Sequence, residues 1–143
     1  MTAALLVIGG CLFGILGLLH AVYTFADARN PRRLAPQDPA VLRSMSSTSV
    51  RISGGATTMW RAWLGFNFSH SLGALMFSAA CIAAALALPG LALPGLALPK
   101  AALLLPVAIG VVYLWLAIHY WFRIPAIGIA LGTLCFAAAW LAY

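Results

Sequence analysis

Four long, uncharged, apolar stretches make up most of the chain: Ala3–Ala26, Ala62–Pro99, Ala101–Phe122 and Ile124–Tyr143. Each supplies the ~20 apolar residues needed to cross the hydrocarbon core of a bilayer. Prolines at positions 89, 94 and 99 should end the second helix early, because proline lacks an amide hydrogen and clashes with the preceding turn. We therefore predict an all-α membrane protein, an up-down bundle of four transmembrane helices over approximately 3–26, 60–88, 101–122 and 124–143.

The first span has two chemically different faces when it is projected as a helix of 3.6 residues per turn. One face carries small, aromatic and polar residues: Gly9, Gly10, Phe13, Gly17, His20, Tyr23, Thr24 and Asp27. The opposite face carries Val7, Ile8, Cys11, Ile15, Leu18, Leu19, Val22 and Phe25. Glycines let helix backbones approach closely, and polar side chains bond to neighbouring helices. We expect the first face to point inward, with Asp27 either solvated or orienting His20.

The second span opens with a polar stretch, Trp60–Gly73. A narrow apolar arc is formed by Leu64, Phe68, Leu72 and Leu75. The remaining circumference is small or polar: Asn67, Ser69, His70, Ser71, Gly73, Ala74 and Ser78. Polar groups at membrane depth are costly, so they face protein or a cavity. We therefore predict that His70 points into the bundle within reach of Asn67, and that Trp60 and Trp63 mark the inner interface.

The polar connection between these spans, residues 27–59, contains one predicted surface helix. Asp38 is suited to be its N-cap and Pro39 its first residue, and the two glycines at 54 and 55 are suited to end it. Its apolar and polar side chains tend to different faces, with Val41, Leu42, Met45 and Ile52 on one and Arg43, Ser47 and Arg51 on another. This pattern is typical of an amphipathic helix on a membrane surface, with arginines near anionic headgroups.

The rest of the chain carries packing and interface signals. The third span ends in an aromatic cluster around His119, so we interpret His119 as an interfacial residue. In the fourth span Gly128 and Gly132 form a small-xxx-small packing face. A pentapeptide beginning Leu-Ala-Leu-Pro occurs three times within residues 86–100, and we interpret it as a turn-rich connector.

Charge is scarce and unevenly distributed. The chain of 143 residues is 64% hydrophobic and 7% charged, whereas soluble domains carry roughly 25% charged residues. Six arginines lie in or beside the connection at 27–59 and a seventh between spans three and four, while Lys100 alone lies at the opposite end of the spans. The positive-inside rule then predicts a cytoplasmic loop at 27–59 and periplasmic termini. We read the net charge of +6 as an orientation signal, and expect no nucleic-acid partner.

Counting reactive residues excludes several kinds of site. Two acidic residues are too few for a carboxylate-bridged di-iron centre, and three histidines are too few for a histidine-rich membrane hydroxylase. The sequence contains no Cys-x-x-Cys motif and no phosphate-binding glycine loop. Cys11, Cys81 and Cys135 lie in different spans without metal-like spacing, and we interpret them as small hydrophobic residues. No reaction is predicted, and whether the protein is an enzyme stays open.

Three functions remain. The first is binding of a lipid or other amphiphilic small molecule at a buried polar layer in the cytoplasmic half, with ligand-binding side chains at His20, Tyr23, Asn67, His70 and Ser71 and headgroup-binding side chains at Arg43, Arg51 and Arg61. The second is a haem b or metal-binding redox protein, because imidazoles such as His20 and His70 from two helices can ligate a haem. The third is a structural subunit, whose partner would be another membrane protein or a second copy. Histidines that only bond neighbouring helices are the alternative to any site.

One stretch carries a family resemblance. Residues 58–73, TMWRAWLGFNFSHSLG, together with His20 and Tyr23, resemble a family of small, uncharacterised four-span bacterial inner-membrane proteins. The resemblance lies mainly within residues 20–73. It implies a bacterial inner-membrane location and a site near His20, Asn67 and His70, and it implies no activity.

Overall fold

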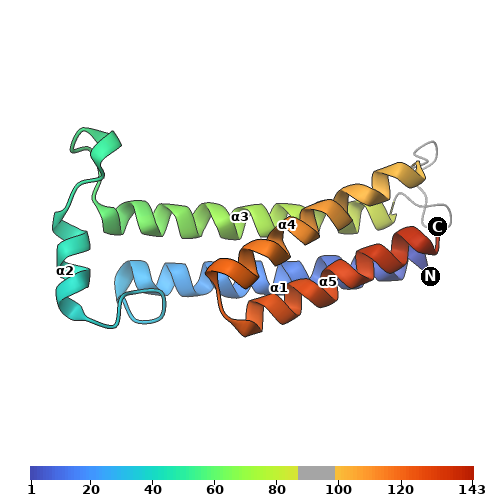
Figure 1. Ribbon diagram of the computed structural model, residues 1–143, viewed down its shortest axis with the longest axis horizontal. Coiled ribbons are helices and arrows are strands. Elements are labelled where there is room, and N and C mark those ends of the chain that lie inside the picture. Colours follow the sequence, from blue (N-terminus) through green and yellow to red (C-terminus); the bar gives the residue numbers. More distant parts are fainter. Residues whose placement is uncertain (87–98) are drawn as a thin grey trace. The chain divides into compact units, whose positions relative to one another are not determined.

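The computed structural model describes residues 1–86 and 99–143, and these residues are helical apart from their connections (Figure 1). The long helices are α1 (Thr2–Arg29), α3 (Met59–Leu86), α4 (Leu104–Tyr120) and α5 (Arg123–Leu141). The short ones are α2 (Pro39–Ser47) and two 3-10 helices, η1 (Arg51–Ser53) and η2 (Lys100–Leu103). Within the described ranges the only β-type pairing is an isolated bridge between Ser49 and Thr58.

The predicted all-α membrane fold is confirmed. α1, α3, η2 with α4, and α5 are each long and apolar enough to cross a membrane, so the chain is a multi-pass membrane protein. α1 is longer than the predicted 3–26 and continues through Asp27 to Arg29. The predicted end of the second span near residue 88 and the proline-containing repeat fall largely at 87–98, outside the described residues.

The chain divides into two compact units. Unit 1 comprises Met1–Leu16 and Ala74–Tyr143, and unit 2 comprises Gly17–Gly73. α1 and α3 contribute to both units. α4 and α5 belong to unit 1, whereas α2 and η1 belong to unit 2.

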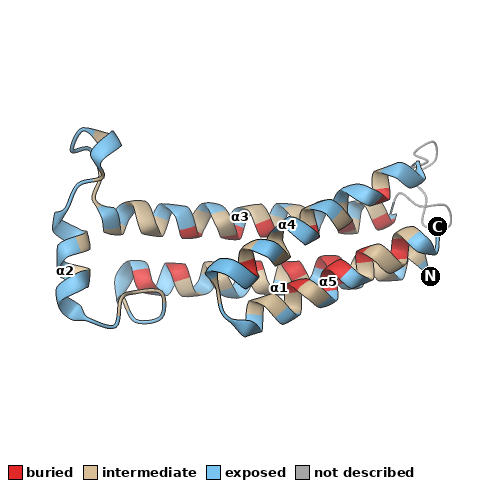
Figure 2. Cartoon of the chain, in the orientation of Figure 1, coloured by how far each residue is buried: buried red, intermediate tan, exposed pale blue. Residues whose placement is uncertain are grey.

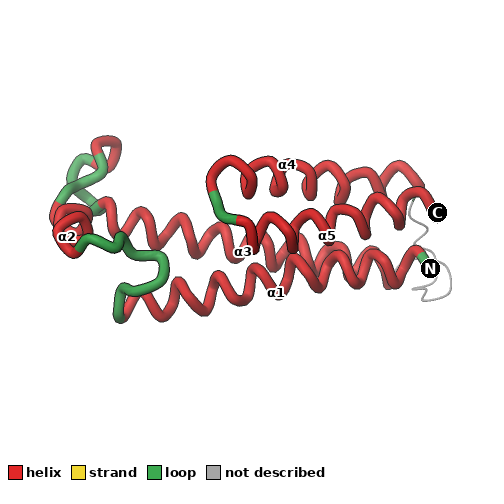
Figure 3. Tube along the Cα trace, turned by 60° about the horizontal axis from the view of Figure 1, so that its bottom comes forward, coloured by secondary structure: helices red, strands yellow, loops and turns green. Residues whose placement is uncertain are grey.

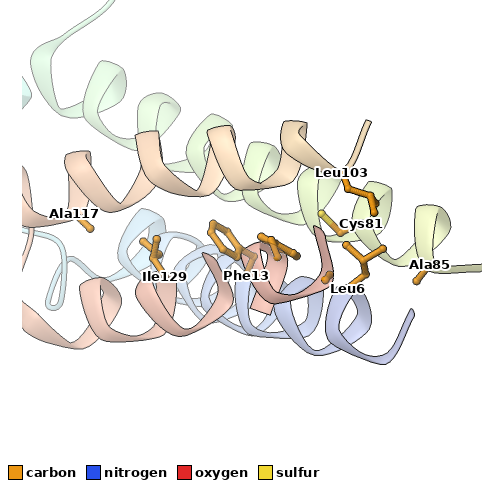
Figure 4. Close-up of a cluster of buried hydrophobic side chains, with 9 residues drawn as sticks. Leu6, Phe13, Cys81, Ala85, Leu103, Ala117 and Ile129 are labelled. Carbon is orange, nitrogen blue, oxygen red and sulfur yellow. The ribbon is translucent and has the colours of Figure 1, made fainter. Parts of the chain in front are cut away.

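Unit 1 has an apolar core to which all four long helices contribute (Figure 4). Its buried members are Leu6, Phe13, Cys81, Ala85, Leu103, Ala117, Ile129, Phe136 and Ala139. The Phe13 ring is central, because its centroid lies 4.9 Å from that of Phe77, 5.6 Å from that of Tyr113 and 5.7 Å from that of Phe136. Two of these three contacts are edge-to-face, the arrangement favoured by the ring quadrupoles.

Glycines set the close approach of α1 and α5 in unit 1. A Cβ added to Gly9 would lie 3.0 Å from the carbonyl oxygen of Gly132, and one added to Gly128 would lie 2.9 Å from the Leu16 side chain. The small-xxx-small packing face of the fourth span is therefore confirmed. Early residues of α1 meet later residues of α5, so these two helices are antiparallel.

α1 and α3 also approach each other closely at glycines of α1. A Cβ added to Gly10 would lie 3.3 Å from Cys81 Cβ, and one added to Gly14 would lie 2.6 Å from Ser78 Oγ. These helices are antiparallel too, and α4 returns as α5 after residues 121 and 122 (Figure 3). Unit 1 thus has the predicted up-down order.

The predicted faces of α1 are confirmed by burial (Figure 2). The buried residues of the predicted inward face are Gly9, Gly10, Phe13, Gly17, Thr24 and Asp27. The exposed residues of the opposite face are Ile8, Cys11, Ile15, Leu18, Leu19, Val22 and Phe25. In α3 the inward prediction holds for Asn67, Ser71 and Ala74 but is wrong for Ser69, which is exposed and donates to the Phe66 carbonyl one turn earlier.

In unit 2 the surface helix begins as predicted and ends earlier. Asp38 Oδ1 accepts a 2.7 Å hydrogen bond from the amide two residues on, and Pro39 is the first helical residue. The predicted end at 54–55 is wrong, because α2 stops at Ser47. The hydroxyls of Ser46 and Ser47 donate to carbonyl oxygens one turn earlier, and this competition with backbone bonding disfavours continuation of a serine-rich helix.

Candidate functional site

A layer of polar side chains joins α1 to α3 inside unit 2. His20 Nε2 lies 2.9 Å from Asn67 Oδ1, and because an amide oxygen only accepts, the imidazole donates. The Asn67 amide nitrogen donates in turn to the Trp63 carbonyl at 2.7 Å. Asn67 is completely buried. The Asn67 side chain therefore makes one hydrogen bond to α1, through its oxygen, and one to α3, through its nitrogen.

The remaining hydroxyls of this layer also have partners. Thr24 Oγ1 donates to the His20 carbonyl at 2.8 Å, and Ser71 Oγ donates to the Asn67 carbonyl at 2.9 Å. In the described ranges no buried side-chain nitrogen or oxygen lacks a hydrogen-bond partner. We call His20, Thr24, Asn67 and Ser71 the polar layer; the His20–Asn67 bond joins the two helices, and the other hydrogen bonds of the layer stay within one helix.

His70 lies beside this layer. Its ring centroid is 5.3 Å from that of His20 in an edge-to-face contact, and 6.2 Å from that of Phe66. The predicted inward orientation agrees with its half-buried state. The expected partnership with Asn67 is different: the Asn67 oxygen bonds His20 across the helix pair. The predicted partner was the nearest histidine on the same helix, whereas the Asn67 amide reaches a histidine on the neighbouring helix.

The histidine pair does not fit a bis-histidine haem. Axial histidines bind iron from opposite faces of the porphyrin, so the macrocycle must lie between the two rings. Here the rings of His20 and His70 contact each other, and His20 Nε2 is occupied by Asn67. In the part of the chain that the structure describes, no three histidine, cysteine or acidic side chains are grouped as metal ligands.

Asp27 has a role that the sequence did not reveal. It is 1% exposed, and its carboxylate accepts hydrogen bonds from the amides of Arg33, Leu34 and Ala35 at 2.7 to 3.1 Å. Both expectations for it, solvation and orientation of His20, are therefore wrong. An aspartate at the end of a helix, followed by Asn-Pro, was the available signal, because a carboxylate there can accept amides of a chain that turns back.

The loop that Asp27 holds is fixed by two further contacts. Trp63 Nε1 donates to the Leu34 carbonyl at 3.0 Å, which ties the loop to α3. The guanidinium carbon of Arg33 lies 4.3 Å from the centroid of the Tyr23 ring, a cation–π contact. Tyr23, predicted as a ligand-binding residue, thus contacts Arg33 of the same unit. Trp63 therefore anchors this loop, and its place at the membrane interface stays a prediction.

Unit 2 also carries six exposed arginines, which we call the arginine surface: Arg29, Arg32, Arg33, Arg43, Arg51 and Arg61. The three predicted headgroup-binding residues lie on different elements, Arg43 on α2, Arg51 on η1 and Arg61 on α3. The expectation that Arg43 and Arg51 share a helix face is wrong, because α2 ends between them. The chain has only two acidic residues. Asp27 is buried and accepts hydrogen bonds from backbone amides, and Asp38 caps α2.

The other candidates lie in unit 1. His119 is exposed in the last turn of α4, donates through Nδ1 to the Trp115 carbonyl at 2.8 Å, and contacts the Trp115 ring. This agrees with an interfacial residue. Cys81 is buried and Cys135 half-buried, whereas Cys11 is exposed on the apolar face of α1.

Comparison with protein-family models, with curated proteins and with solved structures finds no match to this chain. The resemblance of residues 58–73 to a family of four-span membrane proteins therefore stays a prediction.

Proposed function

We propose that the protein binds anionic amphiphiles, membrane phospholipids foremost, through the arginine surface of unit 2. The supporting observation is a charge imbalance. Six exposed arginines accompany one exposed aspartate, Asp38. The other acid, Asp27, is buried and accepts hydrogen bonds from the backbone amides of residues 33–35. Guanidinium groups bind phosphate oxygens with two parallel hydrogen bonds, so a phosphate-bearing headgroup is the ligand chemistry that this surface suits.

The polar layer has a supporting role in this proposal. The His20–Asn67 bond joins α1 to α3, and Asp27 with Trp63 fixes the loop that bears Arg32 and Arg33. Ligand phosphate would then meet arginines whose backbone is already ordered, which lowers the entropy lost on binding. This assigns the side chains of the layer to positioning and the arginines to contact with ligand.

The orientation follows the positive-inside rule. We propose a bacterial inner-membrane location with residues 27–59 in the cytoplasm and both termini in the periplasm. A Ser47→Cys variant, on exposed α2, tests it. A membrane-impermeant thiol reagent should label this position in inverted vesicles and spare it in intact cells; labelling only from outside intact cells would reverse the topology.

Lipid retention tests the binding function. The protein is purified in mild detergent, exchanged against mixed phosphatidylglycerol and phosphatidylcholine, and the retained lipid is counted by native mass spectrometry. Each arginine near an anionic surface contributes about 1 kcal/mol. Replacing Arg43, Arg51 and Arg61 by alanine should therefore weaken phosphatidylglycerol binding by about 3 kcal/mol, on the order of 100-fold.

The matched control is Arg123→Ala, which removes an exposed arginine from unit 1. It should leave retention of phosphatidylglycerol within about fivefold of wild type, since one such arginine contributes about 1 kcal/mol and Arg123 lies outside the arginine surface. Equal loss in the triple variant and in Arg123→Ala would reject the arginine surface as the binding site. Equal retention of phosphatidylcholine and phosphatidylglycerol by wild type would reject anionic selectivity.

A further inference from the structure

The loop between α2 and α3 presents one apolar side chain outward. Ile52, in η1, is 95% exposed, which is the largest exposed fraction among the large apolar side chains that the structure describes. Its neighbour Arg51 is exposed as well. Exposure of a whole isoleucine side chain to water is unfavourable relative to burial. The position therefore suits a residue that contacts something apolar outside the chain.

Ile52 is held in place by the loop around it. The Val50 amide donates to the Thr57 carbonyl at 3.1 Å, and Ser53 Oγ donates to the Val50 carbonyl at 2.7 Å. The chain then reverses at Gly54 and Gly55, whose φ angles of 58° and 96° are readily adopted only by glycine. The isoleucine is thus presented at a fixed point of a closed turn.

The turn is tied to the start of a membrane span. The Met59 amide donates to the Thr48 carbonyl at 2.9 Å, and Ser49 pairs with Thr58, so residues 48–58 close directly onto the first turn of α3. In Figure 1 this segment lies beside the start of α3, and α2 runs crosswise to α3 at the same end. Trp60, one residue further along, is of the type that marks membrane interfaces. Ile52 is therefore placed near the level at which the apolar span begins.

We propose that Arg51 and Ile52 form a lipid anchor, in which Ile52 enters the boundary between headgroups and acyl chains while Arg51 contacts a lipid phosphate. Amphipathic elements of membrane proteins bury apolar side chains about 5–10 Å into this boundary. The positive charge of the arginine surface favours an anionic leaflet as the occupant over a basic or neutral protein surface. This inference rests on the proposed binding of anionic lipid by unit 2, and adds a penetrating residue to it.

Site-directed fluorescence tests the anchor in the full chain. In a variant without native cysteines (Cys11→Ser, Cys81→Ala, Cys135→Ala), Ile52→Cys is labelled with an environment-sensitive nitrobenzoxadiazole dye. The protein is reconstituted into vesicles of phosphatidylglycerol and phosphatidylcholine. Ala56→Cys, exposed in the same loop, is the matched control. The dye at position 52 should emit at shorter wavelength and be quenched by shallow spin-labelled lipid, and the dye at position 56 should behave as in water.

Trypsin cleavage after Arg51 provides a measurement without a dye. In the same vesicles Ile52→Ser should speed cleavage at this bond several-fold, because the anchor no longer holds the turn against lipid, while cleavage after Arg43 should not change. A dye at position 52 that is as solvent-exposed as the dye at position 56, or equal cleavage rates in wild type and Ile52→Ser, would overturn the anchor. Lipid retention by the arginine surface is measured separately, so an anchor that fails while phosphatidylglycerol is still retained leaves the proposed function standing.

Discussion

Different interactions stabilise the inside of unit 1 and the inside of unit 2, although α1 and α3 run through both units. The buried residues of unit 1 are mainly apolar, with a cluster of aromatic rings around Phe13 and glycines where backbones meet. Unit 2 buries Thr24, Asp27, Asn67 and Ser71 instead, and each of them makes a hydrogen bond within the unit. Helices in lipid associate by either route, through close packing or through polar contacts.

This difference predicts different sensitivities. Packing in unit 1 depends on shape, so changes of volume should be costly there. Bonding in unit 2 depends on specific partners, so loss of one donor or acceptor should be costly while modest changes of volume are tolerated. Exposed positions in both units supply controls. Effects on stability can be measured by unfolding in sodium dodecyl sulfate, and they should decrease in size from Phe13 to the His20–Asn67 pair.

Phe13→Ala should have the largest effect. Phe13 is 1% exposed and its ring contacts three others, so truncation leaves a cavity that costs about 3–5 kcal/mol. Phe122→Ala, at a side chain that is 61% exposed, is the control and should change stability little. Comparable losses in the two variants would mean that unit 1 is not organised around Phe13.

Gly9→Val tests the close approach of α1 and α5. A Cβ at Gly9 would lie 2.5 Å from the Phe136 ring and 3.0 Å from a backbone oxygen, and the oxygen has little room to move. Overpacking of this kind costs about 1–3 kcal/mol. Gly65→Val is the control in unit 2, because a Cβ there would have no atom within 4 Å. A destabilisation by Gly65→Val as large as that by Gly9→Val would remove the contrast in packing between the units.

Asp27→Ala tests the polar chemistry of unit 2. Three loop amides lose their acceptor, which should cost about 1–3 kcal/mol and increase hydrogen exchange at residues 33–35. Asp38→Ala, which removes the exposed cap of α2, should lose about 1 kcal/mol and affect exchange only in α2. Unchanged protection of residues 33–35 in Asp27→Ala would contradict the assigned role of the carboxylate.

A double-mutant cycle on His20→Leu and Asn67→Leu should give the smallest effect. The coupling energy expected for one interhelical hydrogen bond in a membrane is about 0.6 kcal/mol, with about 1.7 kcal/mol as the upper end. The cycle His70→Leu with Asn67→Leu is the control and should give less coupling, since the Asn67 oxygen bonds His20. A larger coupling energy for His70 with Asn67 than for His20 with Asn67 would show that Asn67 bonds His70, the partner predicted from the sequence.

Periodicity and charge in the sequence were enough to predict the spans and their faces. The four spans and the two faces of α1 were predictable because glycines and polar residues recur at helical spacing on one side, as with Gly9, Phe13 and Asp27. The N-cap at Asp38 was predictable because capping is local: the acceptor and the amide are two residues apart.

Contacts between residues that meet only after folding were missed. Asp27 is separated from its loop amides by a turn whose path no periodic pattern encodes. Asn67 had two histidines within plausible reach, and only the placement of α1 beside α3 selects His20. α2 was predicted too long because the glycines at 54–55 were assigned to its end, whereas the serines after Arg43 already compete for its backbone bonds.

Photo-crosslinking to a phosphatidylglycerol with a photoreactive headgroup tests the central claim most directly, because it reports where anionic lipid lies against the folded chain. Crosslinks should be concentrated in peptides from residues 29–61, should be lost when Arg43, Arg51 and Arg61 are replaced by alanine, and should be sparse with the phosphatidylcholine analogue. Crosslinks of equal yield around Lys100 or Arg123, or a pattern in 29–61 that the triple substitution leaves unchanged, would contradict the arginine surface as the site of lipid binding.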